Sequence, residues 1–230
     1  MIPFRFFLVF VIFCIVSSLV PLHAAKTFQV IFLNRPESVP QEVRLYVNGE
    51  EQEDPIVFPR NRFSGNYEIE GQEAVQLHFT VQSYEDPKQL KSFPTVKIPA
   101  TWSKFLLLAF EDPSNASLPI RFLKMDASGS EFKAGDFRFM NFLDNKFAGK
   151  VGSKKLEIKG KGMQTIRDFA EHNTDFRMQI NVLKPEAKVK VQTLTNKRLR
   201  YNEKYRTLFF VYEREGSRRI TYHAAEIRGL

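Results

Sequence analysis

The sequence predicts an all-β protein made of two tandem antiparallel β-sandwich domains. Short apolar segments bounded by Gly, Pro or Asn recur at intervals of about 8 to 12 residues, which is the strand spacing of such sandwiches. In addition, residues 104–126 have a second copy at residues 206–226, where LFFVYE repeats LLLAFE. The copies lie about 100 residues apart, the size of one small sandwich. We therefore place the domains at residues 26–127 and 128–230, after a signal peptide at residues 1–25.

The composition agrees with two folded domains. The 230 residues are 43% hydrophobic and 26% charged, and they include 23 Phe against one Trp. These proportions are typical of a globular chain and unlike those of a disordered one. The chain is long enough to bury a sizeable core.

The first 25 residues have the pattern of a secretory signal peptide. A continuous apolar run covers residues 6–20, and cleavage is expected after Ala24 or Ala25. The alternative is a membrane anchor, but the run is shorter than the roughly 18 to 20 residues that span a bilayer. The single cysteine, Cys14, leaves with this leader, and an exported chain without disulfides suits a bacterial envelope. We expect a periplasmic or extracellular protein that is not an integral membrane protein once the leader is cleaved.

The first domain is expected to begin with two strands and a tight turn. Residues 27–33 and 43–47 are joined by a Pro-containing loop, and Asn48-Gly49 marks a turn because both residues tolerate positive φ. Residues 75–82 alternate apolar and polar side chains, which predicts one face on the core and one in water. The hairpin at 104–126 starts with a continuous apolar run, typical of a strand buried on both faces.

The second domain follows a link rich in small residues at 127–135. Residues 175–183 repeat the alternation of the first domain, and residues 163–172 are predicted to form one or two helical turns. The other strands are expected at residues 136–142, 147–151, 155–159 and 188–192, and in the closing hairpin at 206–226.

Part of the first half resembles a known type of domain. VIFLNRPESVPQEVRLYVNGEE, FSGNYEIEG and VQLHF are similar to an uncharacterised family of secreted bacterial immunoglobulin-like sandwich domains. That family has a strand ending in Asn, a Pro-containing loop, a strand ending in YVNG or YVDG, and a later Ser-Gly-Tyr element. Here these fall on Asn34, residues 46–49 and residues 64–67, where the extra Asn66 departs from the pattern. The resemblance implies immunoglobulin-like envelope or surface modules without known catalysis.

Charge is divided unevenly between the two halves. Residues 26–115 carry 9 Lys and Arg against 13 Asp and Glu, whereas residues 116–230 carry 24 against 13. The chain has a net charge of +8, so its basic character belongs to the second half. Opposite charges of this kind could also join the two domains, or join neighbouring molecules head to tail.

The segment NKRLRYNEKYR is the predicted binding site for a polyanion. Lys and Arg neutralise phosphate, sulfate or carboxylate groups, and interleaved Tyr rings can stack on sugars. The structural alternative is a solvated loop and a protected strand edge, since edge cations discourage pairing between sheets. The candidate residues are Lys197, Arg198, Arg200, Tyr201, Lys204, Tyr205 and Arg206, together with Lys154 and Lys155.

Catalytic and metal-binding patterns are weak by comparison. His78, His172 and His223 have no second ligand at the spacing that metal sites require. Glu111 and Glu213 are equivalent in the two hairpins, which leaves a hydrolase with paired carboxylates as an alternative, although solvated strand ends explain the same placement. We expect no enzyme activity, no metal and no cofactor.

The sequence thus predicts an exported, non-catalytic binding or structural module of the bacterial cell envelope. Its basic second domain would dock on an anionic glycan or lipid headgroup, or on a protein partner, and intracellular nucleic acid is not expected. One alternative is a glycan-processing hydrolase. The other is a subunit of a surface or secretion assembly that recognises its partner through a strand edge.

Overall fold

The computed structural model describes residues 25–129, 132–184, 190–214 and 219–230. The predicted leader lies outside the described residues except for Ala25, which begins the first strand. Within these ranges, no helix is long and apolar enough to cross a membrane.

The described chain is almost entirely β-structure, as the sequence predicts. In the first half the strands are β1 (Ala25–Phe32), β2 (Glu42–Val47), β3 (Glu50–Glu51), β4 (Ile56–Val57), β5 (Tyr67–Glu70), β6 (Val75–Thr80), β7 (Thr95–Ile98), β8 (Lys104–Glu111) and β9 (Ile120–Asp126). In the second half they are β10 (Phe137–Asn141), β11 (Phe147–Val151), β12 (Lys154–Ile158), β13 (Met163–Ile166), β14 (Asp175–Leu183), β15 (Val191–Arg200), β16 (Arg206–Arg214) and β17 (Arg219–Ile227). A short 3₁₀ helix, η1 (Pro87–Ser92), precedes β7.

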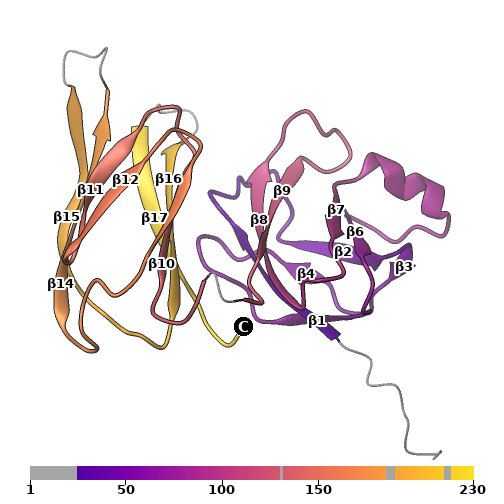
Figure 1. Ribbon diagram of the computed structural model, residues 1–230. Coiled ribbons are helices and arrows are strands. Elements are labelled where there is room, and N and C mark those ends of the chain that lie inside the picture. The colour runs from indigo at the N-terminus through magenta and orange to yellow at the C-terminus, as the bar shows by residue number, and fades with distance from the viewer. Residues whose placement is uncertain (1–24, 130–131, 185–189, 215–218) are drawn as a thin grey trace, which may run out of the picture.

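These strands form four sheets that follow one another across the molecule (Figure 1). The outer first sheet has the order β3-β2-β6-β7, with β4 also paired to β2, and the inner first sheet has the order β5-β1-β8-β9. The inner second sheet has the order β13-β10-β16-β17, and the outer second sheet has the order β12-β11-β14-β15. Each half of the chain therefore supplies one outer and one inner sheet.

Three apolar layers separate the four sheets. One core cluster joins the two sheets of the first half, and a second joins the two sheets of the second half. A third cluster lies between the two inner sheets and takes Ile31 and Leu106 from the first half, and Leu208 and Phe210 from the second. The two halves are thus packed directly on each other.

This arrangement explains why the first strand of each closing hairpin has a continuous apolar sequence. Along β8, Phe105 and Leu107 enter the core of the first half, while Leu106 and Leu108 enter the layer between the inner sheets. Successive side chains of a strand point to opposite faces, so both faces of β8 must be apolar. The prediction that this strand is buried on both faces is confirmed, because Phe105, Leu106, Leu107 and Leu108 are all fully buried.

The two halves repeat the same strand order. In each inner sheet the opening strand pairs with the first strand of the closing hairpin, as β1 does with β8 and β10 does with β16. In each outer sheet the next strands pair in the same succession. The sequence similarity between the closing hairpins therefore belongs to a repeat that extends over both halves.

Two details differ from the sequence expectation. The β1–β8 and β10–β16 pairs are parallel, whereas all other neighbouring strands in the described sheets are antiparallel as predicted. Parallel strands are usually buried on both faces, which fits the apolar runs found there. The helical turn predicted from Met163 is wrong, because Met163–Ile166 is strand β13 and pairs with β10.

The turn at Asn48-Gly49 is confirmed, with φ values of 52° and 96°.

Candidate functional site

The outer second sheet presents one face to solvent, and that face is basic. It lies on the side of the molecule away from the first half (Figure 1). The even-numbered residues of β14 enter the core, so Arg177 points outward. Arg177 is opposite Arg198 on β15, and Lys150 on β11 is opposite Lys155 on β12. All four residues are exposed, and we call them the outer basic face.

The cations of this face are only partly neutralised. Lys155 Nζ lies 2.9 Å from Glu157 Oε2, and Arg198 Nε lies 3.0 Å from Asp175 Oδ2. Within the described ranges Lys150 has no ion pair. One cation from each of four adjacent strands spans about 15 Å, since neighbouring strands lie about 4.8 Å apart. The face can therefore contact several anionic groups at once.

Two neighbouring lysines stabilise the carboxylate of Glu157 on this face. Its carboxylate accepts hydrogen bonds from Lys146 and Lys155, which lower the pKa of Glu157 to about 2. On the next strands Arg177 Nε donates to Asn196 Oδ1 at 2.7 Å, a bond that leaves the guanidinium charge without a carboxylate partner in the described structure. The four cations of the outer basic face therefore outnumber the two carboxylates that pair with them, Glu157 and Asp175.

Two of the residues predicted to bind a polyanion are buried instead. Tyr201 is 9% exposed and packs against core rings that include Phe137. Arg206 is 8% exposed and donates from Nη1 to Ala127 O at 2.9 Å and from Nη2 to Leu230 O at 2.6 Å. Desolvation lowers the pKa of Arg206, with a smaller contribution from a nearby cation. Both side chains stabilise the fold and do not reach the surface.

The other predicted residues do not form one cluster. Lys154 begins β12, at the opposite edge of the sheet from β15. Lys204 is exposed in the turn before β16, and Tyr205 lies under the guanidinium of Arg228, 4.8 Å from ring centroid to Cζ. The structure therefore brings Arg198 and Lys155 onto the outer basic face and leaves these three residues apart from it.

Lys197 and Arg200 line a cavity of about 930 Å³ that we call the edge cavity. Its wall on one side is the loop at residues 61–66 of the first half, which contributes Arg62. On the other side lie β15 and β17 of the second half. Both halves of the chain are needed to form this cavity.

A second cavity, of about 370 Å³, brings the paired glutamates together. It is lined by Glu111 from the end of β8, by Glu213 from β16 and by Asp144. Lys161 also lines it, and its Nζ lies 3.4 Å from Asp144 Oδ1. Packing of the two inner sheets thus places the equivalent glutamates of the two repeats at one cavity.

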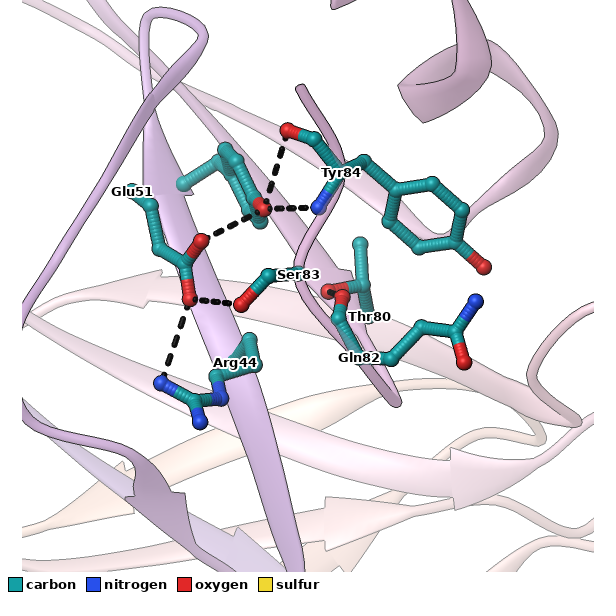
Figure 2. Close-up of polar contacts among 7 residues, drawn as sticks. Arg44, Glu51, Thr80, Gln82, Ser83 and Tyr84 are labelled. Carbon is teal, nitrogen blue, oxygen red and sulfur yellow. Dashed lines mark hydrogen bonds and ion pairs between the residues drawn. The ribbon is translucent and has the colours of Figure 1, made fainter. Parts of the chain in front are cut away.

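The acidic segment of the first half is held to the fold at Glu51 (Figure 2). The Tyr46 hydroxyl donates to Glu51 Oε2 at 2.8 Å and accepts from the Tyr84 amide at 2.7 Å. Ser83 Oγ donates to Glu51 Oε1 at 2.8 Å, and Arg44 Nη1 lies 3.2 Å from the same oxygen. The hydrogen bond from Ser83, followed by that from Tyr46, lowers the pKa of Glu51. This network closes one end of the outer first sheet.

His78 is held inside the first half by two polar neighbours. His78 is buried in β6, and its ring nitrogens lie 3.1 Å from Gln76 Nε2 and 3.0 Å from Thr95 Oγ1. Desolvation lowers the pKa of His78, so the ring is neutral at physiological pH. Among the residues that the structure describes, no group of three or more His, Cys, Asp or Glu side chains could hold a metal ion.

Sequence reasoning missed three cations that matter for these sites. Arg177 could have been found, because the alternation of residues 175–183 already points it away from the core. Lys150 needed the strand register, since its neighbours Lys155 and Gln179 come from other strands. Arg62 gave no local signal, because it meets the edge cavity only through the packing of the two halves.

Comparisons with known proteins add no relative from which a role could be transferred. No protein-family model matches the chain, and no curated protein matches it.

Proposed function

We propose that this protein is an exported, non-catalytic binding module of the bacterial cell envelope that docks on an anionic polymer through its outer basic face. The observation that carries the proposal is the alignment of Lys150, Lys155, Arg177 and Arg198 on four adjacent strands of an uncovered sheet. In this proposal the four sheets are two tandem immunoglobulin-like β-sandwiches, and the leader-like start of the chain directs export.

A polymer suits this face better than a single small anion. The cations are spread over about 15 Å of sheet surface, so a ligand must carry repeated charges to meet them all. The face has no enclosing walls, and exposed charges act at long range and are weakened by salt. Anionic envelope glycans and the headgroups of anionic lipids both provide repeated charges.

The test compares binding at low and high salt by the protein from residue 26 to residue 230. The probes are polygalacturonate, for an anionic glycan, and phosphatidylglycerol vesicles, for a lipid surface. The test variant carries Lys150→Ser, Lys155→Ser, Arg177→Ser and Arg198→Ser. The control variant carries Arg60→Ser, Lys88→Ser, Lys91→Ser and Lys97→Ser, which remove the same charge from exposed positions of the first half.

We expect one probe to bind the wild-type protein and the control variant, and to be released by salt. The test variant should lose at least about 90% of its binding while its circular dichroism is unchanged, because each lost contact is charge-assisted. Equal binding by the two variants would show that the outer basic face is only a solvated surface.

A glycan-processing hydrolase is a second candidate, favoured by the shared position of Glu111 and Glu213 at one cavity. Paired carboxylates on either side of a glycosidic bond can act as acid and base. Incubation with soluble envelope glycans, followed by a reducing-sugar assay, tests this candidate. Activity that disappears in Glu111→Gln and in Glu213→Gln would support it, and a lack of product from the wild-type protein would reject it for those glycans.

A further inference from the structure

The edge cavity lies where the two sheets of the second half separate. β15 and β17 are edge strands of the outer and inner second sheets, and they are linked by a hydrogen bond from the Tyr222 hydroxyl to Thr195 Oγ1 at 3.2 Å. The floor of the cavity consists of side chains from the core of this half: Phe137, Met178, Leu199, Phe209 and Tyr222. A hydrocarbon group that entered the cavity would therefore contact the same kind of surface as a core side chain.

The rim of the cavity is positively charged. Arg62, Lys197 and Arg200 are exposed there, and none of them forms an ion pair with another described residue. Arg228 also lines the rim, but its Nη2 lies 2.6 Å from Glu226 Oε2, so that pair adds no net charge. The rim thus combines three unneutralised cations with an apolar floor.

The edge cavity also has a buried polar side chain in its wall, that of Gln29. It lines the cavity and is 3% exposed. Its Nε2 donates to Asn66 Oδ1 and to Arg228 O, both at 2.8 Å, and these bonds fix the orientation of the amide. Its Oε1 is buried and has no hydrogen-bond partner among the described residues. A buried acceptor of this kind is unfavourable unless a donor, such as a ligand hydroxyl, reaches it.

We propose that the edge cavity binds a single-chain anionic amphiphile whose head group carries a phosphate and hydroxyls. The acyl chain lies on the apolar floor, the phosphate contacts Arg62, Lys197 and Arg200, and a hydroxyl reaches Gln29 Oε1 through a side-chain shift that uncovers this atom. A volume of about 930 Å³ is near the upper end of the range of about 300 to 1,000 Å³ that is usual for small-molecule sites. A monoacyl glycerophospholipid has this combination of groups.

The proposal goes beyond polymer docking and uses different residues. Arg62, Lys197, Arg200 and Gln29 are not members of the outer basic face. Loss of one binding activity should therefore leave the other intact, and either proposal can fail without the other.

The experiment measures the binding of myristoyl lysophosphatidylglycerol, below its micelle concentration, to the protein from residue 26 to residue 230 by isothermal titration calorimetry. Two comparison ligands separate the contributions. Lysophosphatidylcholine with the same chain keeps the tail but adds a cationic group, and glycerol 3-phosphate keeps the head group without the tail.

Three variants test the site. Arg62→Ser with Lys197→Ser removes rim charge, and Ala224→Trp fills the cavity from an exposed position on β17. Arg60→Ser with Lys204→Ser is the matched control, because both cations are exposed and neither lines the cavity. Circular dichroism and the unfolding midpoint establish that each variant is folded.

We expect lysophosphatidylglycerol to bind the wild-type protein and the control variant. The rim variant should bind at least about tenfold more weakly, since hydrogen bonds to charged groups are lost. The Ala224→Trp variant should lose binding, and glycerol 3-phosphate alone should not bind detectably.

Several results would overturn the proposal. Equal affinity for the phosphatidylcholine analogue would show that the rim does not select an anion, and binding of glycerol 3-phosphate alone would show that the floor has no role. Lack of lysophosphatidylglycerol binding would reject the ligand class. Binding of an extended peptide with alternating Glu and Leu, without any lysolipid binding, would assign the cavity to a protein strand that pairs with β15 or β17.

Discussion

The Tyr46 hydroxyl joins two segments of the first half through Glu51 and the Tyr84 amide (Figure 2). Tyr46 is 2% exposed, so Tyr46→Phe would leave that amide without its bond in a buried place. We expect the free energy of unfolding to fall by about 1 to 2 kcal/mol in urea titrations. Tyr84→Phe is the control, because the Tyr84 hydroxyl takes no part in the network drawn in Figure 2. A control with an equal effect would contradict this account.

Glu51 makes the same network sensitive to acid. Its pKa in the folded protein lies below the ordinary value of 4.5, so the stabilisation is present above that ordinary pKa and is lost as the pH falls through the folded value. Glu51→Gln should therefore be less stable than the wild-type protein at neutral pH, with a difference that shrinks on acidification. Unfolding midpoints measured between neutral pH and pH 3 test this, and a constant difference would exclude it.

Among single residues, the sequence correctly predicted the exposure of some binding candidates, but it did not predict that tertiary packing buries others. Arg198 and Lys155 are exposed, as a binding role requires. Tyr201 and Arg206 come from the same basic segment but are buried, because one enters the core of its own half and the other bonds to Ala127 and Leu230. The composition of the segment holds no information about which side chains point inward.

Strand β11 depends on a glycine for its place between β12 and β14. A Cβ on Gly149 would lie 1.9 Å from the Gln179 carbonyl oxygen, a backbone atom that cannot move independently. We expect Gly149→Ala to reduce the free energy of unfolding by about 3 kcal/mol, at the upper end of overpacking effects. Chemical denaturation followed by circular dichroism measures it. Gly129→Ala, with nothing within 4 Å of the added Cβ, should be nearly neutral, and similar losses at both sites would argue against the contact.

Elements with strong periodicity could be predicted, and elements defined by their partners could not. The alternation of β14 and the apolar runs of β8 and β16 are found close to the expected positions. β6 is a strand as expected, but its predicted solvent face is wrong, because His78 and Thr80 are buried and Val81 is exposed. β13 has a weak pattern that also fits a helical turn, and it becomes a strand because it pairs with β10. The parallel pairs join segments far apart in sequence, so no local pattern specifies them.

The whole molecule should unfold as one unit, because Leu208 and Leu106 are fully buried in the layer between the halves. Leu208→Ala should destabilise the protein by about 2 to 5 kcal/mol. Differential scanning calorimetry should show one transition for the wild-type protein. The effects of Leu208→Ala and Leu106→Ala should not add, since both side chains belong to the same buried cluster. Two independent transitions, or strict additivity, would show that the halves are not coupled.

At the scale of the molecule, the sequence predicted that the hairpin strands are buried on both faces but not what covers them. They are covered by the inner sheet of the other half. Single-sequence patterns record that a face is apolar and do not record its partner. For the same reason the two cavities between the halves, and the residues they bring together, could not be foreseen.

The layer between the inner sheets is built from matching positions of two copies, Leu106 with Leu208 and Leu108 with Phe210. A contact in which the same patch is used on both sides is the hallmark of a twofold homodimer. The two halves of this chain therefore pack through equivalent patches, as the subunits of such a dimer do. Either half produced alone would expose its share of the layer and should pair with a second copy of itself.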